Sequence, residues 1–409
     1  IKSQIENPVI TKTVGVSKLP TRQAKIVVDL GYGDAGKGTI IDYLTRHHNA
    51  HTVVRFNGGA QAAHNVITPD GKHHTFAQFG SGMFFPDVRT FLSRFMLVEP
   101  YAMFNEADHL HALGVHHVFA RTDLDRRALI ITPFHQAANR LREVARGNAR
   151  HGSCGLGIGE TMADWLKVGD DMIFAGNLPH AHTVKRKLRR LRDAKWAEIA
   201  DIRAQVVGNT QANAHLEVFT DDHLIDIATE NYAYLAEQLN LVDEDALKAR
   251  LNRDGTVLFE AAQGILLDEW YGFAPYTTWS TTTFENAETL LNSADYDGER
   301  TRIGVLRAYF CRHGAGPFVT EDEGLRPFTL EPHNVTSEWQ QAFRVGYFDL
   351  VAAKYALKIT GKVDDFALTH IDRIANFPEH KLCTAYRFND DPALLDDYFV
   401  HDNGLISAI

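Results

Sequence analysis

The stretch KIVVDLGYGDAGKGTIIDYLTRHHNAHTVVRF, residues 25–56, decides the fold. It opens with an apolar, β-branched run that predicts a buried strand ending at a glycine-rich turn. Apolar residues then recur at helical spacing over residues 40–48, and a second apolar run follows at 51–56. Strand, glycine turn, helix and strand in this order predict a right-handed βαβ unit.

The rest of the chain continues the α/β pattern. Residues 1–24 contain Pro8 and Pro20 and show no sustained period, which indicates an extended arm before the first strand. We expect further buried strands at 128–132, 256–262, 302–310 and 365–371, and largely helical segments at 185–205 and 222–251. We therefore predict an arm over 1–24 and one α/β domain over 25–409, with a P-loop-like, mostly parallel central sheet, flanking helices and helical insertions.

Composition argues against several classes of protein. A net charge of −10 speaks against a protein that coats nucleic acid, because that task needs surplus Lys and Arg. Cys154, Cys311 and Cys383 lie far apart without CxxC spacing, so neither a disulfide framework nor a thiolate zinc site is indicated. No apolar run approaches the ~20 residues that span a bilayer, and no charged-then-apolar leader opens the chain. We expect a cytoplasmic protein that binds neither nucleic acid nor membrane.

Two further patterns have ordinary explanations. The run KRKLRRLRDAK at 185–195 predicts a solvated helix face, with a partner contact or a phosphate-facing lid as the alternative. Histidine pairs at 47–48, 73–74 and 116–117 are poor metal clips, because adjacent side chains point to different faces. We interpret these pairs as surface histidines.

The glycine turn GYGDAGKG, residues 31–38, matches the phosphate-binding pattern G-x-x-x-x-G-K up to its last position. Its backbone N–H groups, the following helix N-terminus and Lys37 can hold phosphate. Gly38 stands where an ordinary P-loop has Ser or Thr, so the hydroxyl that would bind Mg²⁺ is absent. Asp34 is the candidate substitute, because a carboxylate can ligate Mg²⁺ and can also take a proton from a heterocycle. The alternatives are an Asx-turn or N-cap for Asp34 and a surface position for Lys37.

A second glycine turn, RFNGGAQAAH at 55–64, ends the next strand. Two such turns on neighbouring strands would line one crevice at the carboxyl edge of a parallel sheet. GDAGKG followed by VVRFNGGAQAAH resembles the adenylosuccinate synthetase family, whose usual forms are GDEGKGK and VRYQGGHNAGH. The likeness runs from about residue 25 to 387. It continues through HGSCGLGIG (151–159), FEAAQGILLD (259–268), PYTTWSTTT (275–283), RAYFCRHGAGPFVTE (307–321; KAYSTRVGAGPFPTE in the family) and LTHID (368–372).

The resemblance implies a ligase that phosphorylates the 6-oxo group of IMP with GTP and Mg²⁺ and then displaces the phosphate with aspartate. Asp34 would remove the N1 proton of the purine and ligate Mg²⁺ together with Ala63, His64 would stabilise the moving phosphoryl group, and Gln263 would hydrogen-bond the purine. The donor nucleotide would contact Gly33, Ala35, Gly36, Lys37, Gly38, Asn65, Arg344, Thr369, His370 and Asp372. The purine substrate would contact Gln61, Ser153, Cys154, Gln263 and Thr278, and the amino acid would contact Val335, Thr336 and Arg344. A homodimer is expected, because an arginine of a second subunit completes the pocket in this family.

The departures from the family pattern leave the substrates open. Gln61 replaces an asparagine, and Leu156 replaces an arginine. The arginine-rich loop TTGRRRRTGWLD appears as VTSEWQQAFRVGYFD at 335–349, where Arg344 alone clearly survives and Glu338 is a new acid. Aspartate is the first choice, with Arg312 and Arg344 as the remaining positive charge, and another amino acid is the alternative.

The nucleotides are open in the same way. Asp372 could accept hydrogen bonds from guanine, which favours GTP over ATP, although His370 replaces a lysine. Relatives from phages act on dGMP, and we expect them to have a neutral residue in place of the loop aspartate. Because Asp34 is kept, IMP is the first choice, and GMP or dGMP with ATP or dATP is the alternative. A nucleotide-hydrolysing switch protein and an inactive purine sensor are the competing functions.

Overall fold

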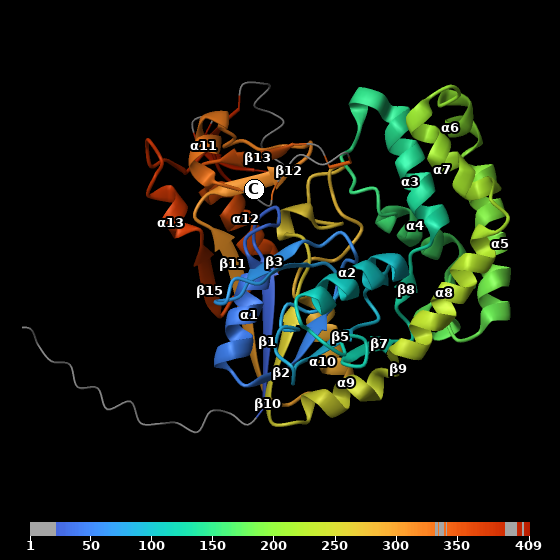
Figure 1. Ribbon diagram of the computed structural model, residues 1–409. Coiled ribbons are helices and arrows are strands. Elements are labelled where there is room, and N and C mark those ends of the chain that lie inside the picture. Colours follow the sequence, from blue (N-terminus) through green and yellow to red (C-terminus); the bar gives the residue numbers. More distant parts are fainter. Residues whose placement is uncertain (1–21, 332–333, 335–338, 341, 389–398, 403–404) are drawn as a thin grey trace, which may run out of the picture.

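The computed structural model describes residues 22–331, 334, 339–340, 342–388, 399–402 and 405–409. At its centre lies an eight-stranded sheet in which every neighbouring pair is parallel (Figure 1). In spatial order the strands are β15 (Asp365–Thr369), β11 (Glu299–Arg307), β1 (Arg22–Asp29), β10 (Gly255–Glu260), β2 (Ala50–Arg55), β5 (Arg89–Leu92), β7 (Thr122–Asp125) and β9 (Asn240–Val242). The predicted α/β class and parallel sheet are confirmed.

Strand β1 shows why the sheet is covered on both faces. Successive side chains of a strand point to opposite sides. Ile26 and Val28 pack into the cluster that contains α10 (Glu285–Ser293) and α12 (Leu350–Thr360), whereas Val27 packs with Ile41 of α1 (Lys37–His47). A strand that is buried on both faces reads as a continuous apolar run, which is the pattern that predicted it.

The order of the strands differs from the simplest expectation. Helix α1 connects β1 to β2, but β10 lies between these two strands and pairs with both. Residues 256–260 of β10 are all buried, so this run occupies the middle of the sheet. The run at 128–132 lies outside the central sheet, where β8 (Leu129–Ile130) pairs with β6 (Leu97–Val98). The strands expected at 302–310 and 365–371 are present as β11 and β15, but β11 ends at Arg307 and β15 at Thr369, and Phe310 begins β12 of a separate small sheet.

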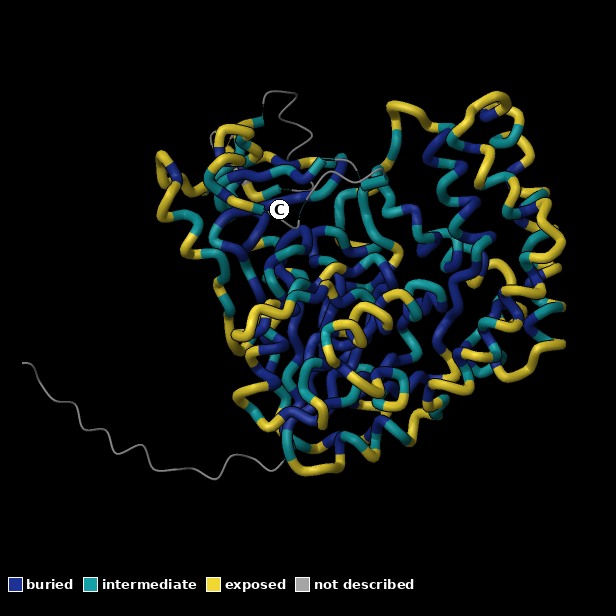
Figure 2. Tube along the Cα trace, in the orientation of Figure 1, coloured by how far each residue is buried: buried dark blue, intermediate teal, exposed yellow. Residues whose placement is uncertain are grey.

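A helical lobe inserted between β8 and β9 packs against one side of the sheet (Figure 1). It shares one apolar core with α2 and the small strands, through residues such as Phe134, Leu188 and Tyr232. Its outer helices are exposed on one side and buried on the other (Figure 2). Helix α2 (Pro100–Ala112) precedes the lobe, and α9 (Glu244–Leu251) follows β9. The helices of the lobe are α3 (Pro133–Arg146), α4 (Ile158–Val168), α5 (Ala181–Glu198), α6 (Ala200–Gln205), α7 (Thr210–Thr220) and α8 (Leu224–Gln238).

The remaining elements surround the carboxyl edge of the sheet. They are the hairpin of β3 (His64–Ile67) with β4 (His73–Phe76), the antiparallel pair of β12 (Phe310–His313) with β13 (Phe343–Gly346), the pair β14 (Phe348–Asp349) with β16 (Leu382–Cys383), the strands β17 (Tyr386–Arg387), β18 (Val400–Asp402) and β19 (Leu405–Ala408), and the short helices α11 (Arg326–Thr329) and α13 (Ile371–Ile374). None of the helices in the described ranges combines the length and the apolar character needed to cross a bilayer.

The expectations of a solvated helix face at 185–195 and of surface histidines in the three pairs were partly wrong. In the charge run, Lys195 is 1% exposed, because its Nζ lies 2.7 Å from Glu160 and 3.0 Å from Asp164 of α4. His74 is also 1% exposed, because β4 turns it toward α2, where its Nδ1 lies 2.8 Å from that of His109. Charge patterns alone did not reveal these buried partners.

Candidate active site

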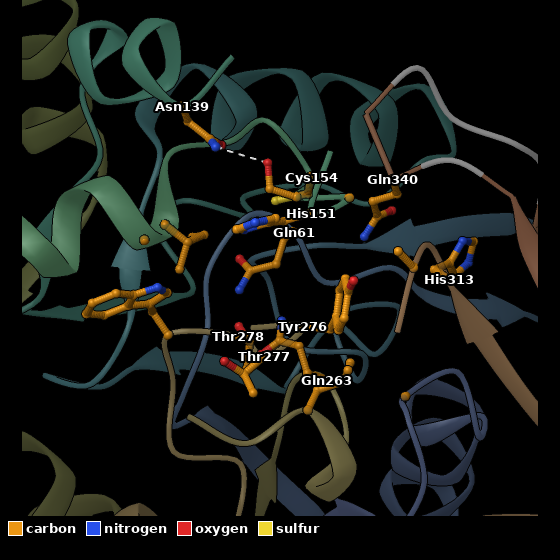
Figure 3. Close-up of a pocket in the computed structure, with 18 of the residues that line it drawn as sticks. Gln61, Asn139, His151, Cys154, Gln263, Tyr276, Thr277, Thr278, His313 and Gln340 are labelled. Carbon is orange, nitrogen blue, oxygen red and sulfur yellow. Dashed lines mark hydrogen bonds between the residues drawn. The ribbon is translucent and has the colours of Figure 1, made fainter. Parts of the chain in front are cut away.

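A cavity of about 510 Å³ opens at the carboxyl edge of β1, β10 and β2, between the sheet and the helical lobe (Figure 3). Open parallel sheets bind ligands at this edge. The loops that follow these three strands contribute Asp34, Gln263 and Gln61 to the lining. Residues 151–154 and 158–160 contribute from the lobe, and 275–279, Arg312, His313 and Ala315 from the far side. The two glycine turns thus line one cavity, although β10 separates their strands.

The phosphate loop is held by Asp29, the last residue of β1. Its carboxylate accepts hydrogen bonds from the backbone N–H groups of Gly31 at 2.8 Å and Ala35 at 2.9 Å, and from the Lys37 ammonium at 3.0 Å. Lys37 is 3% exposed, so the alternative of a surface lysine is wrong. Sequence reasoning missed Asp29. A carboxylate that ends an apolar strand directly before a glycine loop was the available signal.

Gly38 has a packing reason that explains the missing hydroxyl. A Cβ atom at this position would lie 2.8 Å from Cβ of His64 and 3.1 Å from its carbonyl carbon. The first turn of α1 therefore packs directly on the backbone of the second glycine segment, and any side chain at 38 would push His64 away. His64 in turn lines the cavity.

His64 is fixed by a buried carboxylate that sequence reasoning also missed. Its Nδ1 lies 2.6 Å from Oε1 of Glu260, the last residue of β10, whose other oxygen accepts the Ser81 backbone N–H at 2.9 Å. Burial raises the pKa of Glu260, but the neighbouring His64 charge, the hydrogen bonds from His64 and Ser81 and the Arg55 charge together lower it to about 2. Burial lowers the pKa of His64, and Glu260 opposes that shift. The carboxylate is ionised and leaves Nε2 of His64 available to a ligand.

Asp34 has a backbone φ of 58° in the phosphate loop, and its side chain is 25% exposed into the cavity. Helix α1 is capped by Gly36 without a side-chain hydrogen bond, so the N-cap alternative for Asp34 is wrong. Ala63 is exposed in the same lining and can offer a metal only its backbone carbonyl. Within the described ranges no group of three or more His, Cys, Asp or Glu side chains could hold a metal. One carboxylate and one carbonyl fit Mg²⁺, which takes its other ligands from phosphate oxygens and water.

Two buried amides face the cavity without partners (Figure 3). Both polar side-chain atoms of Gln61 and of Gln263 lack a hydrogen-bond partner among the residues that the structure describes. Gln263 lies between the two glycine turns. A Cβ on Gly33 of the first turn would lie 3.7 Å from the Gln263 carbonyl carbon, and one on Gly58 of the second would lie 2.9 Å from its Oε1. Unsatisfied buried amides are costly unless a ligand completes them.

The predicted 5′-phosphate residues line the same cavity from two sides, with Ser153 and Cys154 on the lobe side and Thr278 on the far side. Ser153 accepts a hydrogen bond from the Asn139 amide of α3 at 3.0 Å, and Cys154 lies close to Asn139, whereas Thr278 lies on the other side of Gln61 (Figure 3). Figure 3 also shows Gln61 between Cys154 and Gln263.

The residues expected at the donor nucleotide lie behind the phosphate loop. Thr369 donates to the Ala35 carbonyl at 2.7 Å, and the His370 ring lies against Gly36. Burial, aided by the Arg307 charge, lowers the pKa of His370 to about 4. Asp372 is exposed at the start of α13. The Asn65 side chain is held within the β3–β4 hairpin, where it accepts from Thr75 at 2.7 Å.

The amino-acid residues are placed only in part. Val335, Thr336 and Glu338 lie outside the described residues. Arg344 binds both carboxylate oxygens of Glu321 and also donates to the carbonyls of Gly314 at 3.1 Å and Gly316 at 2.9 Å. Its predicted contacts with the donor nucleotide and the amino acid stay predictions, and they would require these bonds to open.

Comparison with known proteins agrees with this geometry. The family model of adenylosuccinate synthetase matches residues 26–403. The adenylosuccinate synthetase of Clostridium beijerinckii is 33% identical over 387 residues, which cover 91% of this chain and 85% of the relative. That of Chlorobium chlorochromatii is 33% identical over 389 residues, which cover 94% of this chain and 83% of the relative.

Two solved structures share the fold. Fully ligated adenylosuccinate synthetase from Plasmodium falciparum superposes with a TM-score of 0.70 at 23% identity, covering 90% of this chain and 81% of that one. Succinoaminodeoxyadenylate synthetase of cyanophage S-2L, bound to dGMP and dATP, gives 0.59 at 17% identity, covering 90% and 93%. On the sequence matches, the chain belongs to the adenylosuccinate synthetase family, and it is a ligase that forms a carbon–nitrogen bond on a purine nucleotide.

Proposed function

We propose that this enzyme makes adenylosuccinate from IMP, aspartate and GTP. The observation that carries the proposal is that one cavity contains the Asp34 carboxylate, the His64 imidazole and the unpartnered amide of Gln263. A 6-oxopurine presents an N1–H donor beside a carbonyl acceptor. A carboxylate can take that proton, and an amide can donate and accept at the neighbouring atoms.

The chemistry consists of two displacements. Asp34 accepts the N1 proton, electron density moves to O6, and O6 attacks the γ-phosphorus while the bond to the β-phosphate oxygen breaks. GDP leaves, and the Nε2–H of protonated His64 donates to the transferred phosphoryl group and neutralises its charge. The free amine then forms a bond to C6, the C6–O6 bond breaks, phosphate departs with O6, and the amine proton passes to solvent. Mg²⁺, held by Asp34 and the Ala63 carbonyl, would neutralise negative charge on the phosphates.

The proposed donor nucleotide, amino acid, cellular location and oligomeric state follow from the sequence. The exposed Asp372, next to Thr369 and His370 behind the phosphate loop, supports GTP as the donor. Aspartate is the proposed amine, and a different amino acid is the alternative. All three cysteines are free thiols, which suits the proposed cytoplasmic location, and we propose a homodimer from the family resemblance.

The test is phosphate release over a matrix of purine, donor and amine. IMP, GMP and dGMP are each combined with GTP, ATP or dATP, and with aspartate or a panel of other amino acids. We expect turnover only when a purine nucleotide and an amino acid are both present, and the highest turnover with IMP, GTP and aspartate. Turnover with dGMP and dATP would move the assignment to the alternative substrates. Nucleotide hydrolysis without purine and amine would replace the ligase by a switch protein.

A further inference from the structure

His313 is the last residue of β12, and it lines the same cavity as Asp34. Its Nε2 lies 3.4 Å from Oδ2 of Asp34, and the two side chains are 21% and 25% exposed. Within the described part of the chain, the Asp34 side chain makes this ion-pair contact and no hydrogen bond. The proposed base therefore touches a second titratable group before any ligand binds.

The imidazole of His313 is held in place by the antiparallel pair of β12 with β13. Strand β12 pairs antiparallel with β13, so that His313 lies opposite Phe343, and the two ring centroids are 4.9 Å apart. The preceding residue, Arg312, is 2% exposed and donates to the carbonyls of Ala315 at 3.0 Å and Pro317 at 3.2 Å. Nδ1 of His313 is buried and has no partner among the described residues. The packing thus fixes the ring with its Nε2 side at Asp34.

The Asp34 carboxylate has no comparable support from its own loop. The residue adopts a left-handed backbone at φ 58° between Gly33 and Ala35, and the nearby backbone N–H of Ala35 bonds to Asp29 instead. The family form of this segment, RVGAGPF, carries valine where this chain has His313, and valine could not hydrogen-bond a carboxylate. The contact is thus a feature of this chain's own sequence.

We propose that His313 is a positioning residue for the proposed base. Its Nε2–H holds Oδ2 of Asp34 and turns Oδ1 toward the N1 edge of the bound purine. A carboxylate has about four lone-pair sites on two oxygens, so a bond to one oxygen leaves the other free to take the proton. Misplacing a reacting group by about 1 Å can lower a rate about 100-fold, which sets the scale of the expected effect. The inference rests on the proposed function, because it assigns the base the partner that orients it.

The experiment compares His313→Val, the family residue, with His313→Gln, whose amide nitrogen can replace Nε2 as a donor. We expect His313→Val to lower kcat about 10- to 100-fold while the purine Kd stays within about threefold, and His313→Gln to recover most of the loss. His182→Val, on the exposed side of α5, is the matched control. A parent-like kcat in His313→Val would overturn the proposal, and so would equal losses in the Val and Gln variants.

A double-mutant cycle with Asp34→Asn tests whether His313 acts through Asp34. If it does, adding His313→Val to Asp34→Asn changes kcat by less than about threefold, because the group being oriented is already gone. Multiplicative losses would contradict the proposal. A readout free of turnover separates this inference from the proposed function. In ¹⁵N NMR spectra of the imidazoles, Asp34→Asn should move the His313 Nε2 resonance, and an unmoved resonance would remove the contact even if the enzyme acts on other substrates.

Discussion

The sheet edge and strand β12 line the same cavity, but the polar groups of the sheet edge lack partners, whereas those of β12 and its neighbour β13 have them. At the sheet edge, the amides of Gln61 and Gln263 are buried and unpartnered. In the β12–β13 pair, Arg312 donates to three backbone carbonyls. Arg344 binds the Glu321 carboxylate and donates to two backbone carbonyls. The first region is prepared for a ligand, whereas the second holds its own loop in shape. In the free protein, both arginines thus already have partners that a ligand would have to replace.

The largest effect on kcat is expected at Gly38, where the packing against His64 leaves no room for a side chain. Gly38→Ser would restore the ordinary P-loop hydroxyl, but its Cβ would meet His64 at 2.8 Å. We expect kcat to fall about 100-fold, because His64 is displaced from the phosphoryl group, and the free energy of unfolding to fall by about 1–3 kcal/mol from overpacking. Steady-state kinetics and urea unfolding measure both, with Thr39→Ser as the neighbouring control. A faster enzyme would show that the hydroxyl, not the packing, was what this loop lacked.

The next effect concerns the carboxylate behind His64. Glu260→Gln should lower kcat about 10-fold or more, because the neutral amide holds the imidazole less strongly. The pKa of Glu260 is about 2 in the folded protein against an ordinary 4.5, so its contribution to stability is full above pH 4.5 and is lost as the pH falls toward 2. Urea unfolding from pH 6 to 3 should therefore show a smaller loss with falling pH in Glu260→Gln than in the parent. Parallel pH profiles of the two proteins would contradict the account, and Glu237→Gln serves as the exposed control.

A smaller effect should follow from replacing an unpartnered amide. Gln263→Leu removes groups that have no partner in the free protein, so the free energy of unfolding should stay within about 1 kcal/mol of the parent or rise. Purine affinity should weaken about tenfold, because the ligand loses its partners. Calorimetric titration with IMP measures the change, with Gln238→Leu as the control. A destabilised protein with unchanged affinity would mean that the amide serves the fold.

The smallest effect on binding is expected at Arg344. Unlike the Gln263 variant, a variant at Arg344 should lose stability and keep its affinity for the ligand. Arg344→Met should lower the free energy of unfolding by about 1–3 kcal/mol, because the carbonyls of Gly314 and Gly316 and the Glu321 carboxylate lose their donor. The KM for the amino acid should change less than about threefold. Thermal unfolding and kinetics, with the exposed Arg326→Met as control, separate the two. A KM raised tenfold or more in a protein of unchanged stability would show that Arg344 serves the amino-acid site, as its sequence context predicts, and not the loop.

The sequence predicted what depends on local pattern, and it missed what depends on distant partners. The apolar run before GYGDAGKG predicted β1 and its turn, and the glycines predicted where the backbone bends. Nothing local placed β10 between β1 and β2, because strand order depends on contacts between segments about 200 residues apart. Asp29 and Glu260 were missed for the same reason, since a carboxylate at the end of an apolar strand does not reveal which cation it will meet. His313 could have been found from the family form of its segment, where valine stands instead.

The central claim is that the purine's own 6-oxygen attacks the nucleotide, and an isotope experiment tests it directly. IMP labelled with ¹⁸O at the 6-position is turned over with GTP and aspartate, and the released phosphate is analysed by mass spectrometry. The account predicts one ¹⁸O atom in each phosphate, because O6 leaves C6 on the phosphoryl group. Unlabelled phosphate, with the label retained in the purine, would show that water attacked the nucleotide and would contradict the account.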